Sequence, residues 1–381
     1  MKDIDKLFFE LIRVAIGTQE SLSRLPSAGE WGELYKAAKK QSLIGVCFAG
    51  LRRLGADADE GFARIGMSKK LYLTWMGMTA MIQQKNETVN QQCAKLQAKL
   101  FADGKPVRFL KGQGVGLQYA EHLHGLRQSG DIDIWMVPLD KVSEDAHFKS
   151  VMEYVKGLAE CKDFNRQHVQ LLVFEDTEIE IHFMPSRMNC PWHNNRLQKF
   201  FREKGSQYKL LKLGALGRGI CVPSAEFNIV YMLQHCYNHF LFEGVGLRQI
   251  MDYYFVLRNT NCHELPTNCS LILKHVGLKR FASAMMWVLK VVFGLEDQHM
   301  ICEPNENEGR FLLSEIITGG NFGKYGKDGV MEGHEKGKVA FFMARMKRNW
   351  RFLLHYPSEI IWSPYAMLSH YFWKRSMNNK R

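Results

Sequence analysis

The feature that most restricts the fold of this chain is a change in the spacing of its apolar residues. Residues 1 to about 100 place apolar side chains three or four positions apart, as in amphipathic helices, and this spacing returns from Ser224 onward. Between these regions, residues 105 to about 185 contain short segments in which polar and apolar side chains alternate, which is typical of strands. The sequence therefore predicts an α/β block between two helical regions.

Helix-breaking residues mark the start of this block. The apolar spacing over residues 68–102 predicts a long helix, and Asp103-Gly104-Lys105-Pro106 ends it. Because 381 residues are many for a single hydrophobic core, we expect more than one structural unit. The predicted units are an N-terminal helical region (1–104), an α/β core (105–222) and a C-terminal helical region (223–381).

Alternation and turn residues give the order of elements inside the block. The predicted elements are a strand at 107–110, a turn at 111–114, a helix at about 115–121, a strand at 131–137, a helix at about 141–159, and strands at 168–174 and 177–183. Glu175-Asp176 separates the last two strands and predicts a tight hairpin. Further on, residues 319–338 are rich in Gly, Lys and Glu and predict a loop.

Composition limits the partners and the compartment. The net charge is +12 and the pI is about 9.2, which suits a nucleotide, a nucleic acid or an acidic membrane surface without choosing among them. The nine cysteines include no Cys-x-x-Cys pair, which argues against a disulfide framework or a zinc ribbon, so we expect a cytoplasmic protein. No signal-peptide pattern opens the sequence, and no long apolar run predicts a transmembrane helix.

Acidic residues on two predicted strands indicate a metal site. Asp131 and Asp133 are two positions apart on a strand and therefore point to the same face. Two adjacent carboxylates repel each other, and Mg²⁺ neutralises such a pair well. The later strand places Glu178, Glu180 and His182 on one face, so Glu180 can supply a third carboxylate for a two-metal site.

The same short motif also occurs elsewhere without this context. Asp3-Ile4-Asp5 opens a predicted helix, and Asp57-Ala58-Asp59 lies in a predicted loop. Asp131-Ile132-Asp133, in contrast, follows a strand, a glycine turn and a helix. That turn, Lys111-Gly112-Gln113-Gly114, exposes backbone N–H groups and lets a phosphate approach the backbone closely.

These motifs together resemble a known family. Its pattern of Leu-Lys-Gly, then Arg-x-x-x-Asp-(Ile/Val)-Asp, then acid-x-His is similar to Leu110-Lys111-Gly112, Arg127 through Asp133, and Glu180-Ile181-His182. The chain thus resembles the uncharacterised nucleotidyltransferases of the polymerase-β superfamily. Gly246-Leu247-Arg248-Gln249 with Asp252 is similar to the helical segment of that family.

The resemblance implies both a fold and an activity. The implied fold is α+β, with a small mixed sheet framed by N- and C-terminal helical regions. The implied activity is transfer of an NMP from an NTP such as ATP to a hydroxyl acceptor, with Mg²⁺ or Mn²⁺ and release of pyrophosphate. Gly112 then belongs to the nucleotide-binding turn, Asp131 and Asp133 are metal ligands, and Glu180 is the third carboxylate.

One departure from the superfamily concerns the turn, where Gly-Ser or Gly-Gly is usual and the Ser contacts phosphate. Here Lys111 or Gln113 is the candidate substitute. Arg127 is expected to reach phosphate because guanidinium matches phosphate geometry, with a carboxylate partner as the alternative. Arg248 faces the triphosphate or forms an intrahelical ion pair with Asp252.

Histidines and the basic C-terminal region leave alternatives open. His182 is a base near the metals or a hydrogen-bonding residue of the sheet, and His235 and His239 are packed near the cleft in preference to binding zinc. The basic, aromatic tail from residue 340 binds nucleic acid or a membrane surface, or packs on the core. The acceptor is a small molecule, a tRNA or a protein. Alternatives to this function are a toxin-type nucleotidyltransferase that modifies tRNA or protein, and an inactive nucleotide- or RNA-binding member of the fold.

Overall fold

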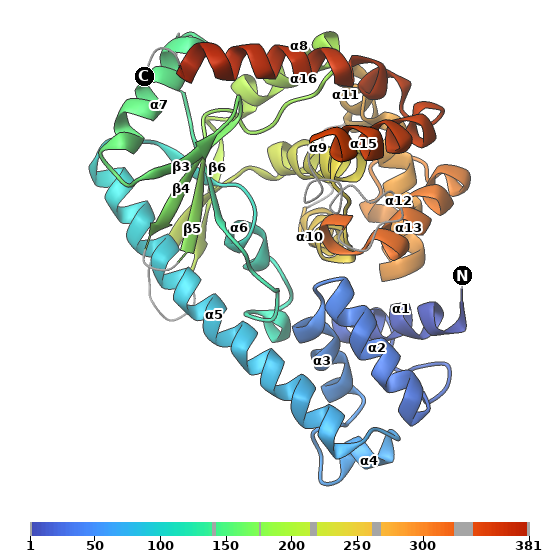
Figure 1. Ribbon diagram of the computed structural model, residues 1–381. Coiled ribbons are helices and arrows are strands. Elements are labelled where there is room, and N and C mark those ends of the chain that lie inside the picture. Colours follow the sequence, from blue (N-terminus) through green and yellow to red (C-terminus); the bar gives the residue numbers. More distant parts are fainter. Residues whose placement is uncertain are drawn as a thin grey trace.

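The computed structural model describes residues 2–138, 142–174, 177–213, 219–260, 268–323 and 338–378 (Figure 1). It has the predicted α+β architecture, with a mixed sheet beside a large helical body. The predicted loop at 319–338 falls mainly outside the described residues, as does the hairpin turn Glu175-Asp176.

Five helices form the N-terminal region: α1 (Asp3–Ile16), α2 (Ala28–Lys40), α3 (Ile44–Arg53), α4 (Gly61–Arg64) and α5 (Lys69–Ala102). The predicted long helix is confirmed as α5, which begins at Ser68, whose side chain accepts a hydrogen bond from the Leu71 amide. Figure 1 shows α5 running from the N-terminal helices to the sheet, so this helix belongs to the framework of both parts.

The sheet has the order β1-β2-β5-β4-β3. Its strands are β1 (Val107–Phe109), β2 (Ile132–Met136), β3 (Cys161–Phe164), β4 (His168–Phe174) and β5 (Thr177–His182). The pairing of β2 with β5 is parallel and the other pairings are antiparallel. The predicted hairpin is confirmed as β4–β5, whereas β3 was not predicted. A separate two-stranded sheet, β6 (Tyr208–Lys212) with β7 (Gly219–Pro223), was also not predicted.

The two faces of the five-stranded sheet differ in polarity. On one face, alternate residues such as Ile134 of β2 and Ile181 of β5 are fully buried in a core that α5 and α7 (Glu144–Lys156) complete. The other face carries Asp133 and Glu180 and is directed toward the helical body. Burial of the apolar side fixes the register of each strand, and register in turn fixes which polar residues share the opposite side.

The C-terminal region is helical, as predicted. Its helices and short 3₁₀ turns are α9 (Ala225–Phe242), α10 (Leu247–Arg258), α11 (Cys269–His275), α12 (Lys279–Phe293), η3 (Asp297–His299), α13 (Glu306–Gly319), η4 (Asn321–Gly323), α15 (Lys338–Leu353) and α16 (Pro357–Asn378). Helix α8 (Pro191–Lys204) precedes this region and was not predicted. One apolar core joins these helices to the N-terminal region, for example through Leu11 of α1 and Val292 of α12. The division into three sequential units stays a prediction.

The end of the chain returns to the sheet. Trp373 of α16 lies with its ring edge-on to Phe148 and Phe164, and Lys374 pairs with Asp163 of β3 at 2.6 Å. One side of the basic, aromatic tail therefore packs on the core, as one of the alternatives predicted. In the part of the chain that the structure describes, no helix has the length and apolar character needed to cross a membrane.

Candidate active site

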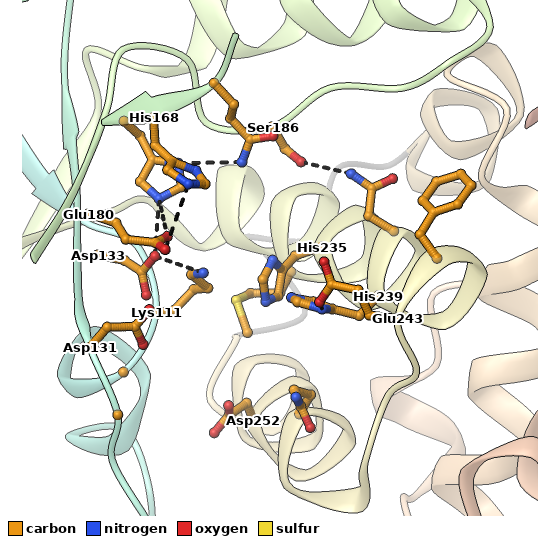
Figure 2. A pocket seen from close by; sticks show the side chains of 18 of the residues that line it. Lys111, Asp131, Asp133, His168, Glu180, Ser186, His235, His239, Glu243 and Asp252 are labelled. Atoms are coloured by element: carbon orange, nitrogen blue, oxygen red, sulfur yellow. Dashed lines mark hydrogen bonds and ion pairs between the residues drawn. The ribbon is translucent and has the colours of Figure 1, made fainter. Parts of the chain in front are cut away.

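Three carboxylates from two neighbouring strands and the residue before one of them meet at the polar face of the sheet. Asp133 is directly opposite Glu180 in the parallel pairing of β2 with β5, and Asp131 immediately precedes β2. One ligand oxygen from each of these three residues lies within 4.8 Å of the others. Figure 2 shows their side chains pointing into the same pocket, so the structure brings together the predicted metal ligands.

The charges in this cluster are only partly compensated. The neighbouring Asp133 and burial raise the pKa of Asp131 to about 6. Burial would also raise the pKa of Asp133, but the Lys111 ammonium and a hydrogen bond from His182 hold it well below its usual range. The Lys111 Nζ lies 2.7 Å from Asp133 Oδ1. Lys111 and His182 thus stabilise the negative charge of Asp133, whereas the negative charge of Asp131 is unfavourable.

Two histidines also contact the cluster. The His182 Nε2 lies 3.0 Å from Asp133 Oδ1 and 3.6 Å from Glu180 Oε2. Burial would lower the pKa of His182, but its bonds to Asp133 and Glu180 raise it. His168 of β4 lies opposite His182, with its Nε2 3.7 Å from Glu180 Oε1. His168 was not predicted, although its place in the hairpin register directly across from His182 could have revealed it.

The donor set fits a divalent cation. Asp131, Asp133 and Glu180 offer oxygen ligands of the kind that Mg²⁺ and Mn²⁺ prefer, and a cation there would remove the repulsion that raises the pKa of Asp131. His168, Glu180 and His182 form an overlapping group within the same 4.8 Å limit. The residues present are therefore suited to hold one or two metal ions.

The glycine turn differs in detail from the prediction. Gly112 has φ +53°, which disfavours any other residue, and it lines the pocket beside Asp131. The helix predicted at 115–121 is shorter: α6 (Gln113–Gly116) is followed by a separate turn, η1 (Glu121–Leu123). Four helical residues give little macrodipole, so α6 would add little to the binding of a phosphate at this turn.

The side chain of Gln113 has a different role from the one expected. It is buried, and its amide nitrogen donates to Asn90 Oδ1 at 2.5 Å and to Asn86 Oδ1 at 3.3 Å, both on α5. Its carbonyl oxygen accepts a hydrogen bond from the Ser129 hydroxyl at 2.7 Å. Gln113 therefore anchors the turn to α5, which leaves Lys111 as the candidate for the predicted side-chain contact with phosphate.

Arg127 also has a partner in the structure. Its Nε and Nη2 donate to the two carboxylate oxygens of Asp252 at 2.7 and 2.8 Å, and both side chains are buried. Tyr119 donates to the same carboxylate at 2.6 Å. Of the two partners predicted for Arg127, the structure therefore shows the carboxylate, which is that of Asp252 on α10.

Arg248 of α10 lines the pocket and donates to the Gln128 carbonyl oxygen at 2.6 Å.

These residues surround a cavity of about 470 Å³ between the sheet and helices α9 and α10. Its far wall is formed by His235, His239 and Glu243 of the α9 segment, with His239 Nδ1 2.8 Å from Glu243 Oε2 (Figure 2). The packed position predicted for the two histidines beside the cleft is confirmed. Among the described residues, the three-ligand groups include neither of them. Polar residues that sequence reasoning missed complete the wall: Asn165, Gln167, Ser186, Arg187, Asn189 and Asn238.

The geometry can be compared with known proteins. A sequence model of the family described as uncharacterised nucleotidyltransferases matches residues 27–294. The chain belongs to this family. The predicted resemblance is thereby confirmed, and the match spans the sheet, the carboxylate cluster and the helices α9 and α10 that close the cavity. Helices α13, α15 and α16 lie beyond the matched residues.

Comparisons of this nucleotidyltransferase family member with individual proteins add little to the family assignment. No curated protein matches the chain. Among solved structures, it is similar to an antigenic nucleotidyltransferase-like protein from Paracoccidioides brasiliensis, with 13% sequence identity and a TM-score of 0.37. That similarity covers 60% of this chain and 97% of the other.

Proposed function

We propose that this protein transfers an NMP from an NTP, such as ATP, to a hydroxyl acceptor and releases pyrophosphate. The observation that carries the proposal is the convergence of Asp131, Asp133 and Glu180, from two adjacent strands, in one cavity of a chain that belongs to a nucleotidyltransferase family. Carboxylates fixed on rigid strands keep their spacing without help from a ligand.

Asp131, Asp133 and Glu180 would hold Mg²⁺ or Mn²⁺. The bound metal would neutralise phosphate charge and stabilise the attacking and leaving oxygens. In the reaction, the acceptor oxygen bonds to the α-phosphorus, and the bond from that phosphorus to the β-phosphate oxygen breaks. Pyrophosphate leaves with the electron pair, and the acceptor proton passes to the Glu180 carboxylate.

Other residues of the cavity bind and orient the nucleotide. The Gly112 turn lets the phosphates approach the backbone beside Asp131. Lys111 of the same turn contacts Asp133, and its ammonium would exchange this carboxylate for a phosphate oxygen if a cation neutralised Asp133. Arg248 lines the same cavity and supplies a second positive charge for the triphosphate. Arg127 acts through Asp252, by fixing α10 to the segment that precedes β2.

The first test is pyrophosphate release from each of the four NTPs with Mg²⁺ or Mn²⁺, in the presence of a cell extract that supplies acceptors. Wild type is expected to release pyrophosphate, and the Asp131→Ala/Asp133→Ala variant is expected to release none. Transfer of label from an α-³²P nucleotide to a component of the extract would then identify the acceptor. Absence of metal-dependent release by wild type, with acceptors from several sources, would contradict the proposal.

One observation favours a second candidate, a non-catalytic nucleotide-binding protein. Asp133 is already neutralised by Lys111 at 2.7 Å and by His182 at 3.0 Å, so this carboxylate has partners without a metal. Such a protein would bind NTP with similar affinity in wild type and in Asp133→Asn, and would release no pyrophosphate. Measuring nucleotide binding and pyrophosphate release on the same samples separates the two candidates.

A further inference from the structure

A second cavity opens beside the candidate active site. It measures about 420 Å³ and lies between the β3–β4 connection, the start of α8 and the middle of α16. Four residues line both cavities: Asn165, Gln167, Arg187 and Asn189. The two spaces therefore share a wall of polar side chains, so the second cavity adjoins the cavity that holds the carboxylate cluster.

Arg187 stands at the junction of these spaces, because it lines the active-site cavity, the second cavity and a third one beside α7. Arg187 makes a weak hydrogen bond from Nη1 to the Met184 sulfur, at 3.8 Å. Most of its donor capacity is thus directed to the cavities. Arg166, which lines the second cavity too, is fixed by Ser369 of α16, to whose hydroxyl and carbonyl oxygens it donates at 2.8 and 2.9 Å.

Carboxylates do not balance these two guanidinium groups. Burial and the neighbouring Arg166 lower the pKa of Arg187, while Glu144 opposes this effect from a distance. Burial also lowers the pKa of Arg166, against a contribution from Tyr365. Glu144 is itself paired with Arg202, at 3.5 Å. Within the described residues, therefore, neither arginine forms an ion pair with a carboxylate.

Two partly buried arginines without an acidic partner are costly unless an anion joins them. Helix α16 adds neutral polar groups to the same cavity, among them Tyr365 and Ser369, and His370 whose pKa is lowered by burial. Hydroxyl, amide and guanidinium groups around one space are the donors that bind a phosphate and the sugar attached to it.

We propose that the second cavity is the acceptor site, and that the acceptor carries a phosphate group which binds at Arg187 and Arg166. The acceptor would be a phosphorylated sugar, either as a free small molecule or as the terminal nucleotide of an RNA. Its hydroxyl would extend past Gln167 toward Glu180. This inference rests on the proposed function for the role of the site, but the binding of phosphate is independent of it.

The nucleotide triphosphate is a less suitable occupant of this position. Figure 2 places Ser186, which precedes Arg187, at the end of the pocket opposite Asp131, whereas the Gly112 turn lies beside Asp131. Lys111 and Arg248 already supply cations on the turn side. The two arginines thus serve a different phosphate.

The test measures binding of inorganic phosphate, ribose 5-phosphate and a short single-stranded oligoadenylate by calorimetry, in EDTA and without NTP. The variants are Arg187→Gln, Arg166→Gln and Arg187→Lys. Arg202→Gln is the matched control, because this exposed arginine lies near the third cavity but outside the second one. Circular dichroism and thermal unfolding establish that each variant is folded, and Arg187→Lys keeps the charge if the Gln variant does not fold.

At least one probe is expected to bind wild type, with affinity about tenfold or more weaker in both Gln variants and unchanged in Arg202→Gln. Preference for oligoadenylate would assign the acceptor to RNA, and preference for ribose 5-phosphate to small molecules. The Asp131→Ala/Asp133→Ala variant should still bind the phosphate probe. Phosphate binding at the two arginines can therefore be shown even if the protein does not transfer nucleotides. Absence of binding by all three probes, or binding that is insensitive to both arginines, would overturn the inference.

Discussion

Asp133 of β2 and Glu180 of β5 are directly paired across parallel strands, although helix α7 and strands β3 and β4 separate them in sequence. The pairing sets two carboxylates side by side on a rigid surface, and His182 and Lys111 converge on the same oxygen of Asp133. Removing any one of these groups should change the charge balance of the whole site.

Glu180 and Glu178 allow a comparison within one strand face. Glu178 is 43% exposed and pairs with Lys162, whereas Glu180 points into the cavity. We expect Glu180→Gln to reduce the rate of nucleotidyl transfer roughly a thousandfold, because several kcal/mol of transition-state stabilisation are lost. Glu178→Gln should change it by less than about twofold. Equal effects of the two variants in a single-turnover assay would show that the position of the third carboxylate is assigned wrongly.

Metal binding should appear in stability as well as in activity. At a concentration of Mg²⁺ or Mn²⁺ about a hundred times the Kd, the free energy of unfolding should rise by about 2.7 kcal/mol, and EDTA should reverse it. Asp131→Asn should abolish this response. Without metal the same variant should be more stable than wild type at pH 7, because Asp133 raises the pKa of Asp131 to about 6 and ionisation is unfavourable there. Thermal unfolding with and without metal measures both effects.

The buried pair of Arg127 and Asp252 should contribute to stability independently of nucleotide. Asp252→Asn leaves the Arg127 charge without its partner, and we expect a loss of about 3–5 kcal/mol. Adding Arg127→Met to that variant should restore part of the loss, since the unpaired charge is removed. Urea denaturation without nucleotide measures the free energy of unfolding of wild type, the two single variants and the double variant. Additive effects of the two changes would instead show that Arg127 and Asp252 contribute to stability independently of each other.

Buried His235 should make stability depend on pH. Burial, and then the nearby Lys111, lower its pKa well below 6.5. The unfolded chain therefore binds a proton near pH 6.5 that the folded chain does not, so stability should be full above that pH and fall as the pH drops below it. The slope for one proton is about 1.4 kcal/mol per pH unit. His235→Gln should reduce the slope in urea titrations between pH 7.5 and 5, and an unchanged slope would assign it to other groups.

Local patterns in the sequence were sufficient for much of the fold. The α5 helix, the β4–β5 hairpin and β2 follow from apolar spacing and turn residues, because period 3.6 and period 2 are fixed by the backbone. Strand β3 was missed since Cys161-Lys162-Asp163-Phe164 has little apolar alternation, and it forms only by pairing with β4 at an exposed edge.

The sequence by itself determined which strand faces carry Asp131, Asp133 and Glu180, because alternation on a strand is a local property. Only the tertiary structure decided what those faces meet. Pairing of Arg127 with Asp252, anchoring of Gln113 to Asn90 and the approach of α16 to Arg166 all join residues that lie far apart in sequence. Such contacts depend on how burial of the apolar faces orients whole elements, and no local spacing encodes that orientation.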